Sequence, residues 1–90
     1  MSKEKTINKD RTYSSAVDNK RIILFNDDVN TFDFVISSLI ELCGHELEQA
    51  EQCAVIVHNN GKCDIKEGSY NELFPIHVEL VTRGLSAEIA

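Results

Sequence analysis

The sequence has no hydrophobic run that approaches the roughly 20 apolar residues needed to cross a bilayer. A secretory signal is not expected either, because the stretch from Met1 to about Lys20 is rich in charged side chains and has no apolar segment. We therefore expect a cytoplasmic protein that does not act at a membrane.

Cysteines are few, and their spacing is wrong for a zinc site. Cys43, Cys53 and Cys63 lie ten residues apart, whereas zinc ligands commonly come in pairs about two to four residues apart. An odd number of cysteines without an export signal also argues against a disulfide framework. Because apolar residues surround all three, we expect them to be small core side chains.

Sequence signals of catalysis are also missing. There is no glycine-rich phosphate loop and no recognisable pair of carboxylates. His45, His58 and His77 lie too far apart to form a metal-binding pair on one helix. A small hydrolase using cysteine and histidine is disfavoured, because a buried thiol is a poor nucleophile. We expect no enzyme activity, no cofactor and no metal.

The charge balance excludes one large class of partner. The chain carries 15 acidic and 9 basic residues, a net charge of −6, whereas nucleic-acid binding requires a basic surface. An acidic protein is better suited to a positively charged ligand, such as a free α-amino group, although acidity also serves solubility.

A length of 90 residues, with 42% hydrophobic residues, fits one compact domain. Residues 1–19 are polar and show no periodicity, so we expect a flexible N-terminal arm. The folded domain is expected to span residues 20–90 and to begin with a buried strand over 21–25. The turn-forming residues 26–28 end this strand.

Helical spacing of apolar residues predicts one helix over residues 31–43 and a second that begins at Leu47. Asn30 or Thr31 could cap the first helix, and Gly44 could end it. The second ends in the segment His58-Asn59-Asn60-Gly61, whose residues tolerate a left-handed conformation.

The last third of the sequence predicts a strand, a helix and a strand. Residues 62–67 alternate polar and apolar side chains, and so do residues 85–89. Ser69 and Glu72 have the spacing of a capping box for a third helix through Val81. Pro75 disfavours a helix interior, so a start near Pro75 is the alternative.

The predicted order β-α-α-β-α-β indicates an α+β two-layer sandwich, in which a small three-stranded antiparallel sheet packs against three helices.

Two polar segments are candidates for a binding site. Asn26-Asp27-Asp28 leaves the first strand directly, although such clusters are usually simple turns. His58 follows the apolar residues 55–57, where a favourable contact with the helix C-terminus is the simpler explanation. If the fold brings the two segments together, they form a polar rim beside an apolar groove. Such a site suits an ammonium group attached to a large apolar side chain.

Four segments resemble the successive signatures of the ClpS family. The family patterns L-x-N-D-D, M-E-F-V, E-x-A and V-H-x-x-G-K correspond to LFNDD at 24–28, FDFV at 32–35, EQA at 48–50 and VHNNGK at 57–62. The match runs without large gaps from about Lys20 to Gly61, and the separations between the segments make it specific.

This resemblance implies a non-enzymatic adaptor that binds N-degrons, meaning proteins with N-terminal Phe, Tyr, Trp or Leu. It also implies delivery of these proteins to a ClpA- or ClpC-type AAA+ unfoldase of the Clp protease. The implied contacts to the α-amino group are Asn26, Asp27, Asp28 and His58, and which aspartate touches the amine stays open. The implied side-chain pocket consists of Asn30, Phe32, Val35, Ser38, Ala54, Val57 and Leu85.

The sequence departs from the family pattern at three pocket positions. Phe32 replaces a Met that gates the pocket, Ala54 replaces a second Met, and Ser38 replaces a Val. The ranking among N-terminal Phe, Tyr, Trp and Leu is therefore open. The alternative is a domain of similar fold that only docks on a partner protein and has no amino-terminus pocket.

Overall fold

The computed structural model describes residues 19–90, so the arm predicted for residues 1–19 lies outside the described residues except for Asn19. The elements, in chain order, are β1 (Lys20–Phe25), α2 (Phe32–Cys43), α3 (Leu47–Asn60), β2 (Lys62–Gly68), α4 (Tyr70–Thr82) and β3 (Ser86–Ile89). The strands form one sheet in the order β2-β1-β3, and both pairings are antiparallel. The α+β fold and the predicted order of elements are confirmed.

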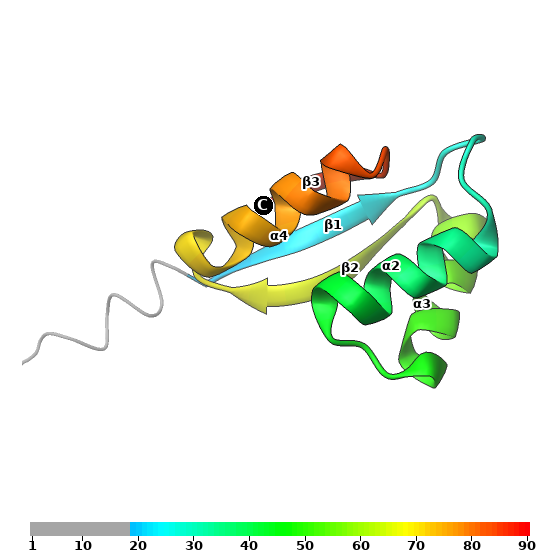
Figure 1. Cartoon of the computed structure of the whole chain (residues 1–90), viewed down its shortest axis with the longest axis horizontal. Coiled ribbons are helices and arrows are strands. Elements are labelled where there is room, and N and C mark those ends of the chain that lie inside the picture. Colours follow the sequence, from blue (N-terminus) through cyan, green and yellow to red (C-terminus); the bar gives the residue numbers. More distant parts are fainter. Residues whose placement is uncertain (1–18) are drawn as a thin grey trace, which may run out of the picture.

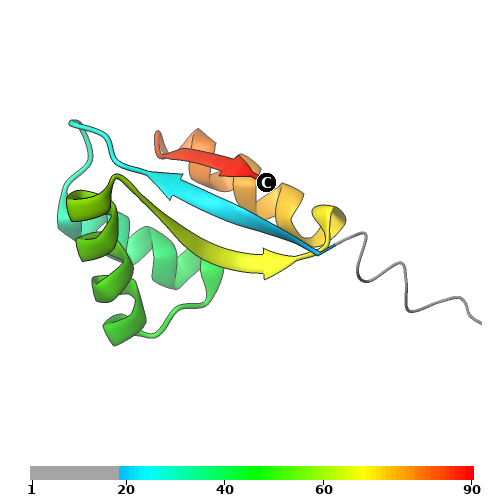
Figure 2. The same ribbon diagram turned by 180° about the vertical axis from the view of Figure 1, so that it is seen from behind.

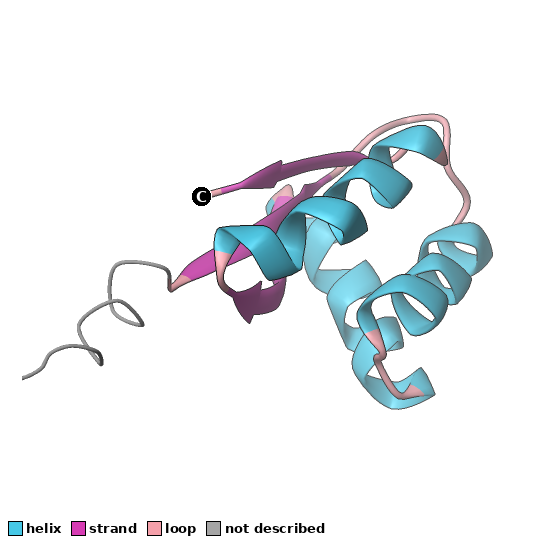
Figure 3. Ribbon diagram, turned by 60° about the vertical axis from the view of Figure 1, so that its left-hand side comes forward, coloured by secondary structure: helices cyan, strands magenta, loops and turns pink. Residues whose placement is uncertain are grey.

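The helices lie against the sheet in two groups. In Figure 1, α4 runs along β1, whereas α2 and α3 lie toward the right-hand end of the strands. From the opposite side, in Figure 2, the sheet lies in front of α2 and α4. Figure 3 shows one helix alongside the strands and the other two as a pair. None of the helices within residues 19–90 is long and apolar enough to cross a membrane.

Local capping fixes the ends of α2 and α3. Thr31 is the N-cap of α2, because its Oγ1 accepts a hydrogen bond from the Phe34 N–H at 3.1 Å. This settles the choice between Asn30 and Thr31. Gly44, with φ of 71°, and Gly61, with φ of 91°, end α2 and α3 in the left-handed conformation that glycine adopts without strain.

The helix α4 begins at Tyr70 and contains Pro75 in its interior, so the alternative start near Pro75 is wrong. The reason is a complete capping box. Ser69 Oγ accepts from the Glu72 N–H at 3.1 Å, and Glu72 Oε1 accepts from the Ser69 N–H at 2.9 Å. These bonds, with the complete burial of Leu73, hold the first turn in place despite the missing N–H of Pro75.

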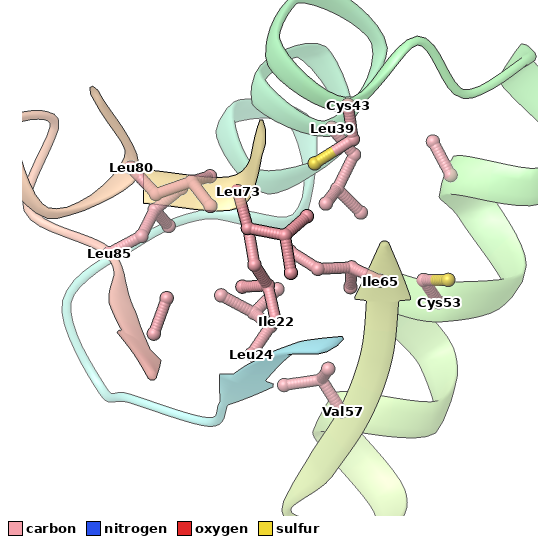
Figure 4. Close-up of a cluster of buried hydrophobic side chains, with 12 residues drawn as sticks. Ile22, Leu24, Leu39, Cys43, Cys53, Val57, Ile65, Leu73, Leu80 and Leu85 are labelled. Atoms are coloured by element: carbon pink, nitrogen blue, oxygen red, sulfur yellow. The ribbon is translucent and has the colours of Figure 1, made fainter. Parts of the chain in front are cut away.

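The core lies between the sheet and the helices. Its fully buried large side chains come from β1, α2 and α4, and Ile65 of β2 joins them (Figure 4). Cys43 and Cys53 are buried in this cluster as predicted, whereas Cys63 is only half-buried beside it. The cysteines are free thiols.

Three connections meet at one end of the sheet. The exit of β1, the α3–β2 turn and the α4–β3 turn all lie toward the right in Figure 1. The last strand begins at Ser86, one residue later than predicted, because the Leu85 N–H donates to the Leu80 carbonyl at 3.0 Å and so belongs to the turn. The Leu85 side chain is nonetheless buried.

Candidate functional site

A cavity of about 60 Å³ opens where these three connections meet. It is bounded by the residues that leave β1, by one face each of α2 and α3, and by the α4–β3 turn. Its lining consists of Leu24, Phe25, Asn26, Asp27, Asn30, Phe32, Val35, Ala54, Val57, His58 and Leu85. The structure thus brings all the predicted site residues together except Asp28 and Ser38.

Leu24 and Phe25 also line the cavity, although the sequence analysis placed them in a buried strand and in the first family signature and did not assign them to the site. They are the last two residues of β1, and Asn26 follows them directly. This adjacency was the available signal.

The backbone brings the two polar segments together. The Asn26 N–H donates to the Gly61 carbonyl at 2.9 Å. Gly61 ends α3, and His58 lies in the last turn of that helix. This hydrogen bond therefore fixes the loop after β1 against the end of α3, and Asn26 and His58 line the same cavity.

Asp27 organises the loop in which it lies. Its Oδ1 accepts from the N–H groups of Val29 and Asn30, both at 2.8 Å, and its Oδ2 accepts from Asn30 Nδ2 at 2.9 Å. The hydrogen bonds from Asn30, backbone first, hold the pKa of the Asp27 carboxyl below its ordinary value of 3.8. Asp27 is therefore a carboxylate at neutral pH, whereas Asp28 is exposed and lies outside the cavity lining.

Asn30 connects this loop to the other end of the chain. Besides its bond to Asp27, its Nδ2 donates to the Gly84 carbonyl at 3.0 Å. Gly84 lies in the α4–β3 turn with φ of 89°, and the next residue, Leu85, lines the cavity. Asn30 thus joins the polar loop to an apolar part of the wall.

The rings of Phe32 and His58 are in contact, and both residues line the cavity. Their ring centroids are 5.4 Å apart with an interplanar angle of 87°, an edge-to-face arrangement that aromatic pairs favour. Phe32 is 45% exposed, so its ring lies at the surface rather than in the core. The contact places an aromatic wall beside the histidine.

Behind the polar rim, the lining is apolar. Val35 comes from α2, Ala54 and Val57 from α3, and Leu85 from the α4–β3 turn. The volume of about 60 Å³ is well below the roughly 150 Å³ of an engineered apolar cavity that admits benzene. An aromatic side chain could enter only if part of the wall moved, and Phe32, whose side chain is exposed, has room to do so.

Ser38 is the other predicted residue that does not line the cavity. It is fully buried, and its Oγ accepts a hydrogen bond from Arg83 Nη1 at 3.3 Å. Ser38 therefore faces the arginine of the α4–β3 turn.

The remaining histidines have structural partners. His45 Nε2 donates to the Ile65 carbonyl at 2.7 Å, and His77 Nε2 donates to the Ala87 carbonyl at 2.8 Å. Burial raises the pKa of the Cys43 thiol to about 11 and that of Cys63 to about 12. These two thiols are protonated at neutral pH, which is the opposite of an activated nucleophile.

Known proteins resemble this chain in sequence. The family model described as "ATP-dependent Clp protease adaptor protein ClpS" matches residues 16–86. The "ATP-dependent Clp protease adapter protein ClpS" of Campylobacter jejuni is 46% identical over 41 residues, which cover 46% of this chain and 43% of that protein. The protein of the same name from Sodalis glossinidius is 34% identical over 65 residues, covering 70% of this chain and 61% of that protein.

The fold also has a counterpart among solved structures. Agrobacterium tumefaciens ClpS2, solved "bound to L-phenylalaninamide", matches with a TM-score of 0.77 over 81% of this chain and 95% of that chain, at 15% sequence identity. At this identity the likeness concerns the fold alone. The segment shared with the Campylobacter jejuni adapter spans less than half of that protein, but the family match covers most of this chain. The chain therefore belongs to the ClpS family of Clp protease adaptors.

Proposed function

We propose that this protein binds other proteins by a free N-terminal residue with a bulky hydrophobic side chain, namely Phe, Tyr, Trp or Leu. It then delivers them to a ClpA- or ClpC-type AAA+ unfoldase for degradation. The observation that carries the proposal is a single cavity that has Asn26, Asp27 and His58 among its polar lining residues and an apolar interior.

The polar residues suit an α-amino group. An ammonium ion donates up to three hydrogen bonds, and the Asn26 amide oxygen, the Asp27 carboxylate and an imidazole nitrogen of His58 are candidate acceptors. The hydrogen bonds that lower the pKa of Asp27 also keep its carboxyl group ionised at neutral pH, and this negative charge attracts a cation. A charge-assisted hydrogen bond contributes roughly 1.5–3 kcal/mol, so the amine must be free to bind.

The apolar residues suit the side chain of the first residue. Burying a Leu or Phe side chain contributes roughly 1.5–3 kcal/mol. The phenylalaninamide bound to Agrobacterium tumefaciens ClpS2 combines a free amine with a benzyl side chain, and a ligand of that kind matches both parts of this cavity.

Binding is tested by fluorescence anisotropy with labelled peptides that differ only in the first residue. We expect peptides beginning with Phe or Leu to bind, and peptides beginning with Ser or Glu to bind at least about tenfold more weakly, a difference of roughly 1.4 kcal/mol. His58→Ala should lose affinity, whereas Asn59→Ala, a neighbouring exposed residue outside the cavity, should keep it. Equal binding of all first residues, or none, would favour the docking-only alternative.

Delivery is a separate part of the proposal and is tested in a reconstituted degradation assay. Family behaviour implies that the arm, residues 1–19, is engaged by the unfoldase in the cytoplasm. Deletion of residues 2–17 should leave peptide binding unchanged and slow the degradation of a Phe-initiated substrate by the ClpA or ClpC protease. Equal degradation by the truncated protein would refute this role.

A further inference from the structure

Arg83 lies outside the cavity, yet it connects two parts of the cavity wall. It is the first residue after α4, in the turn that also contains Gly84 and Leu85. Its Nη2 lies 2.7 Å from Glu41 Oε1, and its Nη1 donates to Ser38 Oγ at 3.3 Å. Both partners are residues of α2, the helix that contributes Val35 to the cavity.

Polar contacts thus hold the α4–β3 turn to two other parts of the chain. Arg83 holds it to α2, and Asn30 holds it to the loop after β1 through the Gly84 carbonyl. Leu85 follows these two anchored residues and lines the cavity. A glycine with φ of 89° just before Leu85 gives the turn a conformation that most residues adopt only with strain.

The ion pair itself lies at the surface, because the Glu41 side chain is 58% exposed, but the hydrogen bond to Ser38 is partly buried. The Arg83 side chain is 29% exposed, and Ser38 is fully buried. A buried hydroxyl needs a hydrogen-bond partner, and Arg83 is one. The planar guanidinium can reach both partners at once because it presents several donors in a fixed fork, which a lysine cannot reproduce.

We propose that Arg83 is a positioning residue for the side-chain cavity, because it holds the α4–β3 turn to α2 and so fixes Leu85 in the cavity wall. This inference rests on the proposed function, since the cavity is taken as the pocket for the first residue. The fixed wall keeps the cavity small, and it therefore determines how strongly the protein discriminates against the largest first residues.

The test compares Arg83→Met with wild type in titrations of peptides beginning with Leu and with Trp. Methionine keeps an unbranched apolar side chain but removes the charge and the donors. We expect the affinity for the Leu peptide to fall by about three- to fivefold, as an exposed ion pair allows. The affinity for the Trp peptide should change less. The dissociation constant of the Trp peptide divided by that of the Leu peptide therefore becomes smaller than in wild type. Arg83→Lys should lie between Met and wild type.

Two further variants separate positioning from general destabilisation. Arg21→Met is the matched control, because Arg21 forms an ion pair with Asp64 at 3.2 Å and does not line the cavity. Arg21→Met should leave the ratio of the dissociation constants of the Trp and Leu peptides unchanged. The double variant Glu41→Arg, Arg83→Glu reverses the ion pair without the donor to Ser38, so it should restore the ratio only in part.

The two possible failures are distinguishable. If wild type binds neither peptide, the proposed function fails and this inference fails with it. If wild type binds but Arg83→Met has an unchanged ratio, the inference alone is wrong. A ratio that changes equally in Arg21→Met also contradicts it.

Discussion

The backbone N–H of Asn26 donates to the carbonyl of Gly61 at 2.9 Å, although the two residues are 35 positions apart in the sequence. This bond joins the end of β1 to the end of α3 and places the Asn26-Asp27 loop beside His58. The polar part of the cavity depends on it, because neither segment alone provides a set of acceptors around one point.

The variant Asp27→Asn tests the loop that follows Asn26. The carboxylate accepts two backbone N–H groups and one amide, so the variant should be less stable and bind a Phe-initiated peptide more weakly at neutral pH. The folded pKa of Asp27 is lowered, so its stabilising contribution is present above 3.8 and is lost as pH falls through the folded pKa. The stability difference, measured by urea unfolding, should shrink below pH 3.8. Asp28→Asn is the control, and a difference independent of pH would contradict the account.

Phe32→Ala tests the aromatic wall. Removing the ring enlarges a cavity of about 60 Å³ and also removes an edge-to-face contact with His58 that is worth about 0.5–1.5 kcal/mol. We expect the ranking of first residues to move toward Trp relative to Leu in competition titrations. Phe34→Ala removes an equally large side chain that does not line the cavity. A ranking that changes alike in both variants would rule out a specific role for Phe32.

The cysteines should be unreactive in the folded protein. Because burial raises the pKa of Cys43 to about 11 and of Cys63 to about 12, thiolate is scarce at neutral pH. Alkylation of these two residues by iodoacetamide, followed by peptide mass spectrometry, should be at least about tenfold slower than in the urea-unfolded chain. Fast alkylation of either residue in the native protein would point to a reactive thiol and reopen the hydrolase alternative.

Ser69→Ala should destabilise the fold without affecting the site. The capping box of α4 loses one of its two hydrogen bonds, which costs about 1 kcal/mol in the free energy of unfolding. Peptide affinity should not change, because Ser69 is not in the cavity lining. Ser37→Ala is the matched control, since Ser37 lies within α2 and its hydroxyl bonds only the Phe34 carbonyl. Equal stability of Ser69→Ala and wild type would show that the capping box contributes little.

Local signals predicted most of the fold. Thr31, Gly44, Gly61 and the Ser69–Glu72 pair act on the chain within a few residues, so the sequence indicated the helix ends, although it left Asn30 and Thr31 as alternative N-caps. Pro75 was misleading as a start signal, because its cost is one hydrogen bond near the N-terminal end of α4, where the capping box already fixes the first turn.

The site was less accessible to sequence reasoning, because its details depend on contacts between distant residues. Ser38 was expected in the pocket because the family resemblance implied it, but Arg83, 45 residues later, reaches it across the fold. The sequence alone does not show which of the two neighbouring residues, Asp27 or Asp28, belongs to the site. Only the three-dimensional loop distinguishes the aspartate that accepts hydrogen bonds from the one that points to solvent.

The central claim is that the cavity recognises a free α-amino group next to an apolar side chain. Its most direct test is the dissociation constant of one Phe-initiated peptide with its amine free and with the same amine acetylated. We predict at least about tenfold weaker binding after acetylation, because the positive charge and its hydrogen bonds are lost. Equal dissociation constants for the two peptides would contradict the account.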